Sequence, residues 1–428
     1  MQSNTTAILR SIAGAAMALA LTAAGQTPVP APAPADSSSA APAAAPAAAP
    51  AQAPAAAPAP AAPAAAPTWS VGPMDLSGFI DGYYSFNFNR PNTSEGFDQL
   101  NQLYNFNDKT DQFELSAAKL TLNHDPDPIG AHVDFIYGRT NDLINNAATN
   151  TTTTTFVASQ LPYLEQAFLS LKPPKAKGFE MDFGKWVTSA GAEVIEAKDN
   201  WNYSRSLLFV NAIPYWHFGA RTSLPVSKTE TVGFQLFNGW NNVSKSNGGI
   251  SGAFTSALVK PKYTWDLNYL VGPENPNTAS GLRNLIDTTL LLTPPGKFNA
   301  YINFDYGQNQ DATYNCGEEE TCGDNHLNKW YGVAGAFHEQ ASAKSAIAGR
   351  FEWFDDANGA QTGTAPTGNT LYEGTFTYEY KWVEGALMRV EYRIDKSNLQ
   401  YFDKLASQFT DQQQTLTVAF IAFFGPHR

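Results

Sequence analysis

Within residues 386–395, charged side chains stand at every second position from residue 389 to residue 395. Arg389, Glu391 and Arg393 alternate there with mostly apolar residues. Because a β-strand sends successive side chains to opposite faces, the segment has one apolar face and one ionic face. An ionic face in contact with water can orient hydrated solutes and set an ion preference. The alternative is that such charges only solvate the face and pair across neighbouring strands.

The residues that usually carry catalysis are scattered. The six histidines show no metal-ligand spacing, and the chain has neither a Gly-x-Ser-x-Gly motif nor a glycine-rich phosphate loop. A lipase-like Ser–His pair assembled from adjacent strands is left open by sequence spacing. We predict no enzyme activity, no cofactor and no metal site. The formal charge of −12 argues against nucleic acid as a partner.

Segments of the same alternating kind recur about sixteen times, with no amphipathic helix between them. After the extreme N-terminus there is no run of eighteen uncharged apolar residues, which excludes a helical membrane protein. A closed barrel in lipid, apolar outside and wet inside, explains these segments better than a soluble fold. The sequence therefore predicts an all-β protein, a transmembrane antiparallel up-and-down β-barrel of about sixteen strands.

The number of strands is predicted from the short and long connections between them. Tight connections rich in Pro, Gly and Lys alternate strictly with longer polar segments, as in outer-membrane barrels with short periplasmic turns and long external loops. An even strand number puts both chain ends on the periplasmic side. The tight connections are residues 125–128, 173–177, 227–229, 260–262, 293–297, 340–344 and 383–385, and the long segments are residues 90–112, 140–162, 187–215, 241–252, 272–281, 308–329, 355–369 and 396–413.

Two segments precede the barrel domain, which we place at residues 69–428. Residues 1–25 predict a secretory signal peptide, because Arg10 precedes a short Ala-rich apolar run followed by small residues. A plain N-terminal helix is the alternative. Residues 26–68 are almost entirely Ala and Pro, which predicts a disordered, extended periplasmic linker. Its expected role is either a passive spacer or a contact with the cell wall.

The chain has two cysteines, Cys316 and Cys322, with five residues between them. In an exported chain an even cysteine count favours a disulfide. Two thiols are too few for a structural zinc site. We therefore predict a Cys316–Cys322 disulfide in a solvated loop.

If the apolar strand faces meet lipid, the opposite faces line the lumen. Arg or Lys facing lipid near the midplane would cost about 2–4 kcal/mol, so we expect these charges to face water. The candidate pore-lining residues on strands are Asp81, Lys185, Arg221, Arg350, Glu352, Arg389, Glu391 and Arg393, with Lys119, Asp134, Arg283, Asp287, Asp305, Glu373 and Glu379 as further members.

The third external loop, residues 187–215, is unusually apolar for a solvated loop. We expect it to fold into the barrel and narrow the pore. The alternatives are a cap over the mouth or a contact with a neighbouring subunit. Its charged residues, Glu193, Glu196, Lys198, Asp199 and Arg205, are candidate constriction residues and stand among Trp201, Tyr203, Leu207, Leu208 and Phe209.

A family resemblance lies in residues 183–221, which read FGKWVTSAGAEVIEAKDNWNYSRSLLFVNAIPYWHFGAR. A Gly-Lys strand end, then Gly-Ala-Glu, then Asn-Tyr-Ser-Arg-Ser and an aromatic run into His-Phe-Gly-Ala-Arg resemble the OmpL-like β-barrel porins (the beta-barrel porin-2 family). The opening Ser-Gly-Phe-Ile-Asp-Gly-Tyr-Tyr, residues 77–84, looks like the family's first strand. The resemblance covers about residue 69 to the C-terminus, and residues 184–221 are its most specific part.

This resemblance implies a Gram-negative outer-membrane porin, a water-filled channel through which small hydrophilic solutes or ions diffuse. It implies outer-membrane lipid, lipopolysaccharide and the barrel-assembly machinery as partners. Analogy with sixteen-stranded porins suggests a homotrimer. The alternative function is a structural or adhesive barrel whose lumen is plugged by residues 187–215.

The C-terminus departs from the usual pattern of such barrels, which end on an aromatic residue that the assembly machinery recognises. Phe424 is in phase for that role, but Gly425-Pro426-His427-Arg428 follow it. Either this tail is tolerated or the assembly signal is internal.

Overall fold

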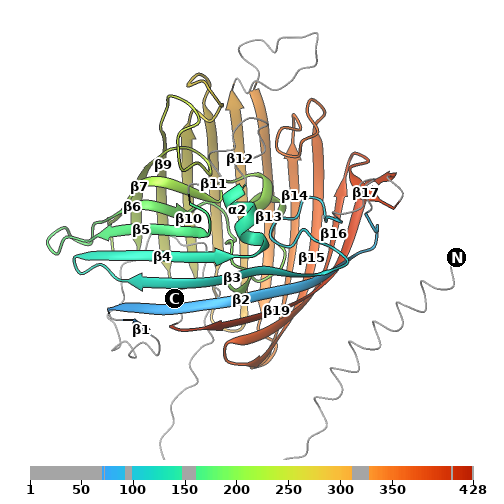
Figure 1. Cartoon of the computed structure of the whole chain (residues 1–428), viewed down its shortest axis with the longest axis horizontal. Coiled ribbons are helices and arrows are strands. Elements are labelled where there is room, and N and C mark those ends of the chain that lie inside the picture. Colours follow the sequence, from blue (N-terminus) through green and yellow to red (C-terminus); the bar gives the residue numbers. More distant parts are fainter. Residues whose placement is uncertain are drawn as a thin grey trace, which may run out of the picture. The chain divides into compact units, whose positions relative to one another are not determined.

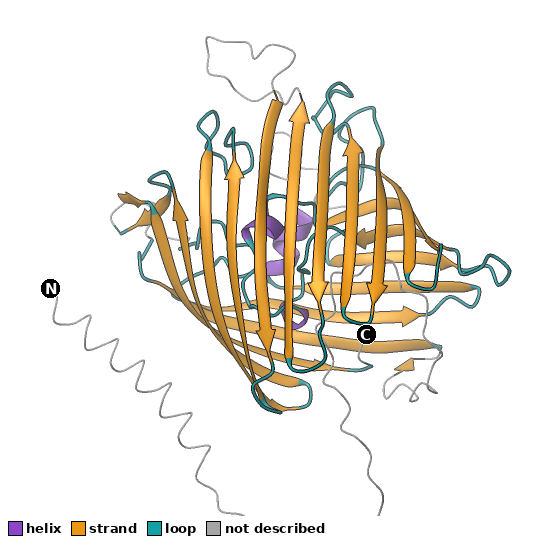
Figure 2. Ribbon diagram, turned by 180° about the vertical axis from the view of Figure 1, so that it is seen from behind, coloured by secondary structure: helices purple, strands orange, loops and turns teal. Residues whose placement is uncertain are grey.

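Sixteen long strands form a closed antiparallel β-barrel (Figure 1, Figure 2). The computed structural model describes residues 70–71, 73–91, 99–146, 161–310, 327–405 and 408–426. Each long strand pairs with the next, and the last, β19 (Gln412–Phe424), pairs with the first, β2 (Met74–Asn87), which closes the ring. The predicted fold class is confirmed. The predicted signal peptide, the Ala/Pro-rich linker and the disulfide between Cys316 and Cys322 lie outside the described residues.

Short elements accompany the barrel. A two-residue strand, β1 (Ser70–Val71), pairs with β2, while β17 (Phe402–Lys404) and β18 (Gln408–Thr410) form a hairpin. The helical segments are α2 (Arg139–Asn146), the 3-10 turn η2 (Ala197–Asp199) and α3 (Leu207–Asn211). In the described part of the chain no helix has the length and apolar character needed to span a membrane. The remaining barrel strands are β3 (Phe113–His124), β4 (Ile129–Tyr137), β5 (Leu164–Leu171), β6 (Glu180–Val187), β7 (Trp216–Pro225), β8 (Glu230–Phe237), β9 (Ser251–Lys260), β10 (Tyr263–Gly272), β11 (Arg283–Leu292), β12 (Phe298–Gln310), β13 (Leu327–Glu339), β14 (Ser345–Asp356), β15 (Asn369–Val383) and β16 (Ala386–Ser397).

Short and long connections alternate around the barrel, as predicted. Residues 384–385 alone join β15 to β16, whereas residues 88–112 join β2 to β3 and residues 188–215 join β6 to β7. The two-residue turn needs a glycine, because Gly385 has φ +79° and an added Cβ would lie 2.5 Å from the carbonyl oxygen of Phe423. Since β2 begins and β19 ends at the short-turn end, both ends of the barrel domain lie there.

The outer face of the barrel is apolar and the inner face is polar. Ile80 and Ile302 are 57 % and 53 % exposed, while their neighbours Asp81 and Asn303 are buried inside. The sequences of these two strands, β2 and β12, show the same alternation of apolar and polar residues. An outward apolar surface of this kind is what a barrel presents to lipid.

Strand β3 departs from simple alternation because it contains a β-bulge. Asp81 of β2 pairs with Ala117, but Gly82 pairs with Leu115, so Ser116 has no partner across the ladder. Ser116 and Ala117 are therefore both buried. A bulge shifts the phase of the side chains, and this explains why residues 113–124 lack a clear period in the sequence.

Candidate functional site

The connection between β6 and β7, residues 188–215, runs through the interior of the barrel, and we call it the inner loop. Ser189 Oγ donates to Asn268 Oδ1 of β10 at 2.8 Å, and Asn202 Nδ2 donates to Thr377 Oγ1 of β15 at 2.8 Å. These strands belong to separate walls, so the inner loop crosses the barrel. The helices lie within the ring of strands (Figure 2). The expected inward fold of this loop is observed, and its effect on the width of a pore stays a prediction.

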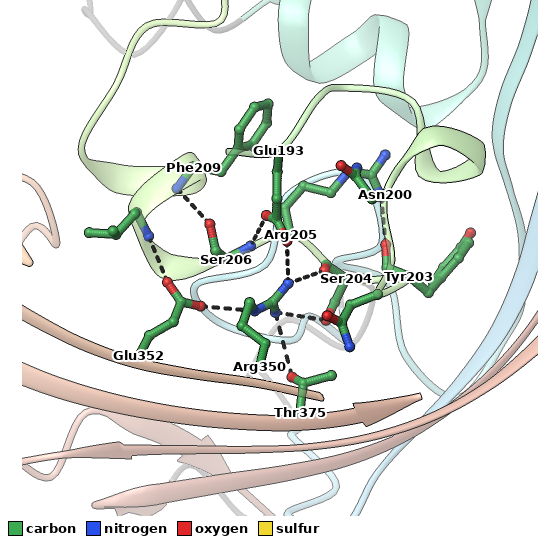
Figure 3. A network of polar contacts seen from close by, with 12 residues as sticks. Glu193, Asn200, Tyr203, Ser204, Arg205, Ser206, Phe209, Arg350, Glu352 and Thr375 are labelled. Atoms are coloured by element: carbon green, nitrogen blue, oxygen red, sulfur yellow. Dashed lines mark hydrogen bonds and ion pairs between the residues drawn. The ribbon is translucent and has the colours of Figure 1, made fainter. Parts of the chain in front are cut away.

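A buried arginine on the barrel wall clamps the inner loop (Figure 3). Arg350 Nη1 of β14 donates to Glu193 Oε1 at 2.6 Å and to the carbonyl oxygen of Ser204 at 2.7 Å. Its Nε lies 3.1 Å from both Glu352 Oε1 and Glu373 Oε2. The side chain is 0 % exposed. One cation therefore joins a carboxylate and a carbonyl of the loop to two carboxylates of the wall.

Wall carboxylates accept hydrogen bonds from the loop backbone. Glu391 accepts from the N–H groups of Tyr203 at 2.5 Å and Ser204 at 2.9 Å. Glu352 accepts from Leu207 and Leu208 at 2.9 and 3.2 Å, at the first turn of α3. The N–H groups in the first turn of a helix, and those of an irregular loop, have no hydrogen-bond acceptor within a helix. The carboxylates of the wall are the acceptors for these N–H groups.

Two further arginines of β16 contact the same loop. Arg389 Nη1 donates to the carbonyl oxygen of Ala197 at 2.5 Å and its Nη2 pairs with Glu379 at 2.8 Å. Arg393 Nη1 donates to the carbonyl oxygen of Arg205 at 2.6 Å. The alternating charges of β16 thus bind loop backbone on the inside of the barrel.

The loop is also held on the β2–β3 side. Tyr203 Oη donates to Asp81 Oδ1 at 2.9 Å, and Lys119 of β3 pairs with Glu196 of the loop. Lys119 also lies 2.9 Å from Asp134 and 2.7 Å from Glu165. Burial alone would raise the pKa of Glu196, but the positive charges of Lys119 and Lys198 outweigh it, so the pKa lies below its usual value.

The side chains of Lys185, Lys198 and Arg205 make other contacts. Lys185 is buried between Asn145 Oδ1 and the carbonyl oxygen of Leu164, both at 2.7 Å, with its Nζ 4.1 Å from the ring centre of Trp216. Lys198 pairs with Asp199 at 2.5 Å, and both side chains are partly exposed. Arg205 belongs to the inner loop but turns back on it, since its Nη1 donates to the carbonyl oxygen of Tyr203 at 2.6 Å. Burial lowers the pKa of Arg205.

Two other long connections also fold inward, which the sequence reasoning missed. Phe106, from the connection between β2 and β3, is 0 % exposed and lies 6.1 Å from Phe209, measured between ring centres. Helix α2, from the connection between β4 and β5, accepts a hydrogen bond from Trp216 Nε1 at the carbonyl oxygen of Ile144, at 2.8 Å. In the sequence, the inward folding of these connections is indicated by an apolar side chain inside a polar segment, Phe106 in the first and Ile144 in the second.

The wall beneath the apolar part of the inner loop is itself apolar. Trp330 Nε1 of β13 donates to the carbonyl oxygen of Ala212 at 3.1 Å. A Cβ added to Gly332 would lie 2.6 Å from Leu208 Cδ2. Residues 330–338 show a poor period in the sequence because their inward side chains meet the loop and not water.

A polar cavity of about 280 Å³ lies near the short-turn end, lined in part by Asp125 and Pro126 of the β3–β4 turn. His132, Asp182 and Arg221 contribute to its lining. Arg221 Nε donates to Asp182 Oδ2 at 2.8 Å, and both side chains keep partial exposure. Arg221 is thus a predicted lining residue that borders open space at this end.

Comparison with known proteins places this architecture among porins. Residues 73–424 match a family model described as "Putative beta-barrel porin-2, OmpL-like". No curated protein matches the chain in sequence. Outer-membrane expressed OmpT of Vibrio cholerae is 10 % identical, with a TM-score of 0.51 over 82 % of this chain and 97 % of that one. An anion-selective porin from Comamonas acidovorans is 10 % identical, with a TM-score of 0.51 over 82 % of this chain and 99 % of that one. At these identities the solved structures share the fold alone, while the family model covers most of the chain. The chain belongs to the OmpL-like beta-barrel porin-2 family.

Proposed function

We propose that this porin-family barrel sits in the outer membrane and lets small hydrophilic solutes and ions diffuse through it. The observation that carries the proposal is the inner loop, which crosses a closed barrel and is bound to its walls by buried charges. A loop that narrows a wide barrel without leaving it is the arrangement a size-limited channel needs. No step of this function needs catalysis or a cofactor.

The predicted pore-lining residues divide into two groups on this proposal. Arg350, Glu352, Glu391 and Arg393 are at most 3 % exposed and hold the loop. Arg221, with Asp182 and the partly exposed pair Lys198 and Asp199, borders the water path. The first group sets the width of the channel, and the second group meets the solute.

Planar-bilayer recording of the purified protein tests the proposal. We expect stable conductance steps, and a larger step when residues 192–211 are replaced by a short Gly-Ser linker. The matched control removes residues 276–279, a mostly exposed tip of the β10–β11 connection, and should leave conductance unchanged. Equal conductance in the linker variant and the wild type would refute a constricting role.

A second candidate function is a structural or adhesive barrel with a plugged lumen. It is favoured by the burial of the β14–β16 charges and by three connections that fold inward. Complete electrical silence of a folded wild-type protein, with conductance in the linker variant, would support the plug. A homotrimer, which cross-linking in outer membranes can detect, and a cell-wall contact of residues 26–68 stay predictions under either function.

A further inference from the structure

The interior of the barrel carries a large excess of acidic side chains. Among the described residues of the barrel strands, eleven Asp and Glu are buried, against four Lys and Arg. The half-buried interior groups do not reverse this difference, because three basic groups are offset by three acidic ones. The basic groups are Lys119, Arg221 and Arg283, and the acidic groups are Asp266, Glu196 and Glu379. The excess of acidic over basic side chains is therefore found in the interior of the barrel, and is not only a property of the whole chain.

Most basic groups of the interior are already neutralised. Arg350 lies within 3.1 Å of three carboxylates, and Lys119 also contacts three. Arg221 pairs with Asp182 at 2.8 Å, and Arg393 pairs with Asp395 at 2.7 Å. A negative ion inside the barrel thus meets few unpaired positive charges.

Several carboxyl groups, in contrast, have no basic partner. Asp287 of β11 stands directly opposite Asp305 of β12, and Asp266 of β10 is two positions along from the residue paired with Asp287. None of the three forms an ion pair with Lys or Arg in the described part of the chain. Asp287 instead accepts amide hydrogen bonds from Asn268 at 2.7 Å and Asn303 at 2.8 Å.

Opposed carboxyl groups of this kind can share one proton and so carry one charge between them. Even if Asp287 and Asp305 together count as one negative charge, the buried carboxylates remain far more numerous than the buried basic groups. The sign of the interior field does not depend on the protonation of this pair. We call Asp266, Asp287 and Asp305 the acidic wall.

We propose that the channel conducts cations in preference to anions, with the acidic wall as a main source of the preference. The proposal rests on the proposed channel function and adds its solute class. Fixed charges close to a narrow water-filled path with low-dielectric walls raise the local concentration of counter-ions and exclude co-ions. Asp287 and Asp305 are 0 % exposed, so they act on an ion through their field and not by contact. The cavity near the short-turn end has the same sign, since Asp125, Glu180 and Asp182 line it with one arginine, Arg221.

The reversal potential under a tenfold KCl gradient measures this preference. We expect a K⁺ to Cl⁻ permeability ratio above unity, falling as salt is raised because screening shortens the reach of fixed charges. One unit charge about 10 Å from an ion in water alters the local ion concentration about twofold. The triple variant Asp266→Asn, Asp287→Asn, Asp305→Asn should therefore lower the ratio by at least about twofold.

The matched control is Glu384→Gln, which removes a carboxylate that is 68 % exposed in the β15–β16 turn. It should leave the ratio unchanged. If the triple variant fails to fold, the single variant Asp266→Asn, at the most exposed of the three positions, takes its place. Channels that prefer Cl⁻ or show no preference overturn the proposal while leaving the channel function intact. Silence of the wild type refutes the channel function and the proposal together, and an unchanged ratio in the folded triple variant overturns the role of the acidic wall.

Discussion

Replacing the clamp arginine should release the inner loop while the barrel stays folded. Arg350→Met keeps a long side chain but removes the cation between Glu193, Glu352 and Glu373. The loop then loses two hydrogen bonds that Arg350 donates to it, one to the Glu193 carboxylate at 2.6 Å and one to the Ser204 carbonyl oxygen at 2.7 Å. The ladder hydrogen bonds of β14 with β13 and β15 are backbone bonds and do not depend on this side chain.

The size of the effect follows from the burial of these groups. Removing one partner of a buried ion pair typically costs about 3–5 kcal/mol, because a charge is left without compensation. All four side chains are at most 4 % exposed, so water screens them little. If the cost falls on the bound state of the loop, the ratio of bound to released loop falls by about two to almost four powers of ten.

Single-channel recording and thiol labelling measure this release independently. The labelling variant carries Ser204→Cys with Cys316→Ser and Cys322→Ser, so that position 204, at 0 % exposure, provides the reporting thiol. We expect Arg350→Met to raise both the conductance and the labelling rate. The control is Lys396→Gln, because Lys396 is 62 % exposed on β16 and pairs only weakly, at 4.0 Å, with Asp411. Unchanged conductance and labelling in a folded Arg350→Met protein would refute the clamp.

Three smaller changes test how the loop is seated, each by the temperature at which the folded barrel is lost and by conductance. Gly332→Val should lower the free energy of unfolding by about 1–3 kcal/mol through overpacking, because an added Cβ would lie 2.6 Å from both Leu208 Cδ2 and the carbonyl oxygen of Trp353. A variant with the unfolding temperature and the conductance of the wild type would contradict this close approach. Trp330→Phe removes the 3.1 Å donor to Ala212 and should cost about 1 kcal/mol; equal stability would mean that water replaces the bond. Ser206→Ala removes the side chain that accepts from Phe209 N at 2.9 Å and should also cost about 1 kcal/mol, whereas a larger loss would show that α3 supports more of the loop than its cap.

The barrel itself is largely predictable from the chain. Alternation around Ile80 and Ile302 reports which face meets lipid, because a strand has a period of two and lipid tolerates only apolar side chains. The alternation of short and long connections then orders the strands. The alternation predicts the strand faces poorly at two places. At Trp330 the inner face of the strand packs against the inner loop, and at Ser116 a β-bulge shifts which side chains point inward.

The candidate site is predictable only in part. The apolar content of residues 187–215 indicates that this loop is not simply solvated, and the alternating charges of β16 indicate an ionic inner face. Neither observation pairs Arg350 with Glu193, which is 157 positions earlier in the chain, nor Glu391 with the backbone of Tyr203. Such contacts depend on how sixteen strands close into a ring and on where one loop crosses it. The sequence by itself determined which side chains face inward, since that is a local property of each strand, and only the tertiary structure decided which of them meet water and which hold the loop, since that depends on the whole circumference.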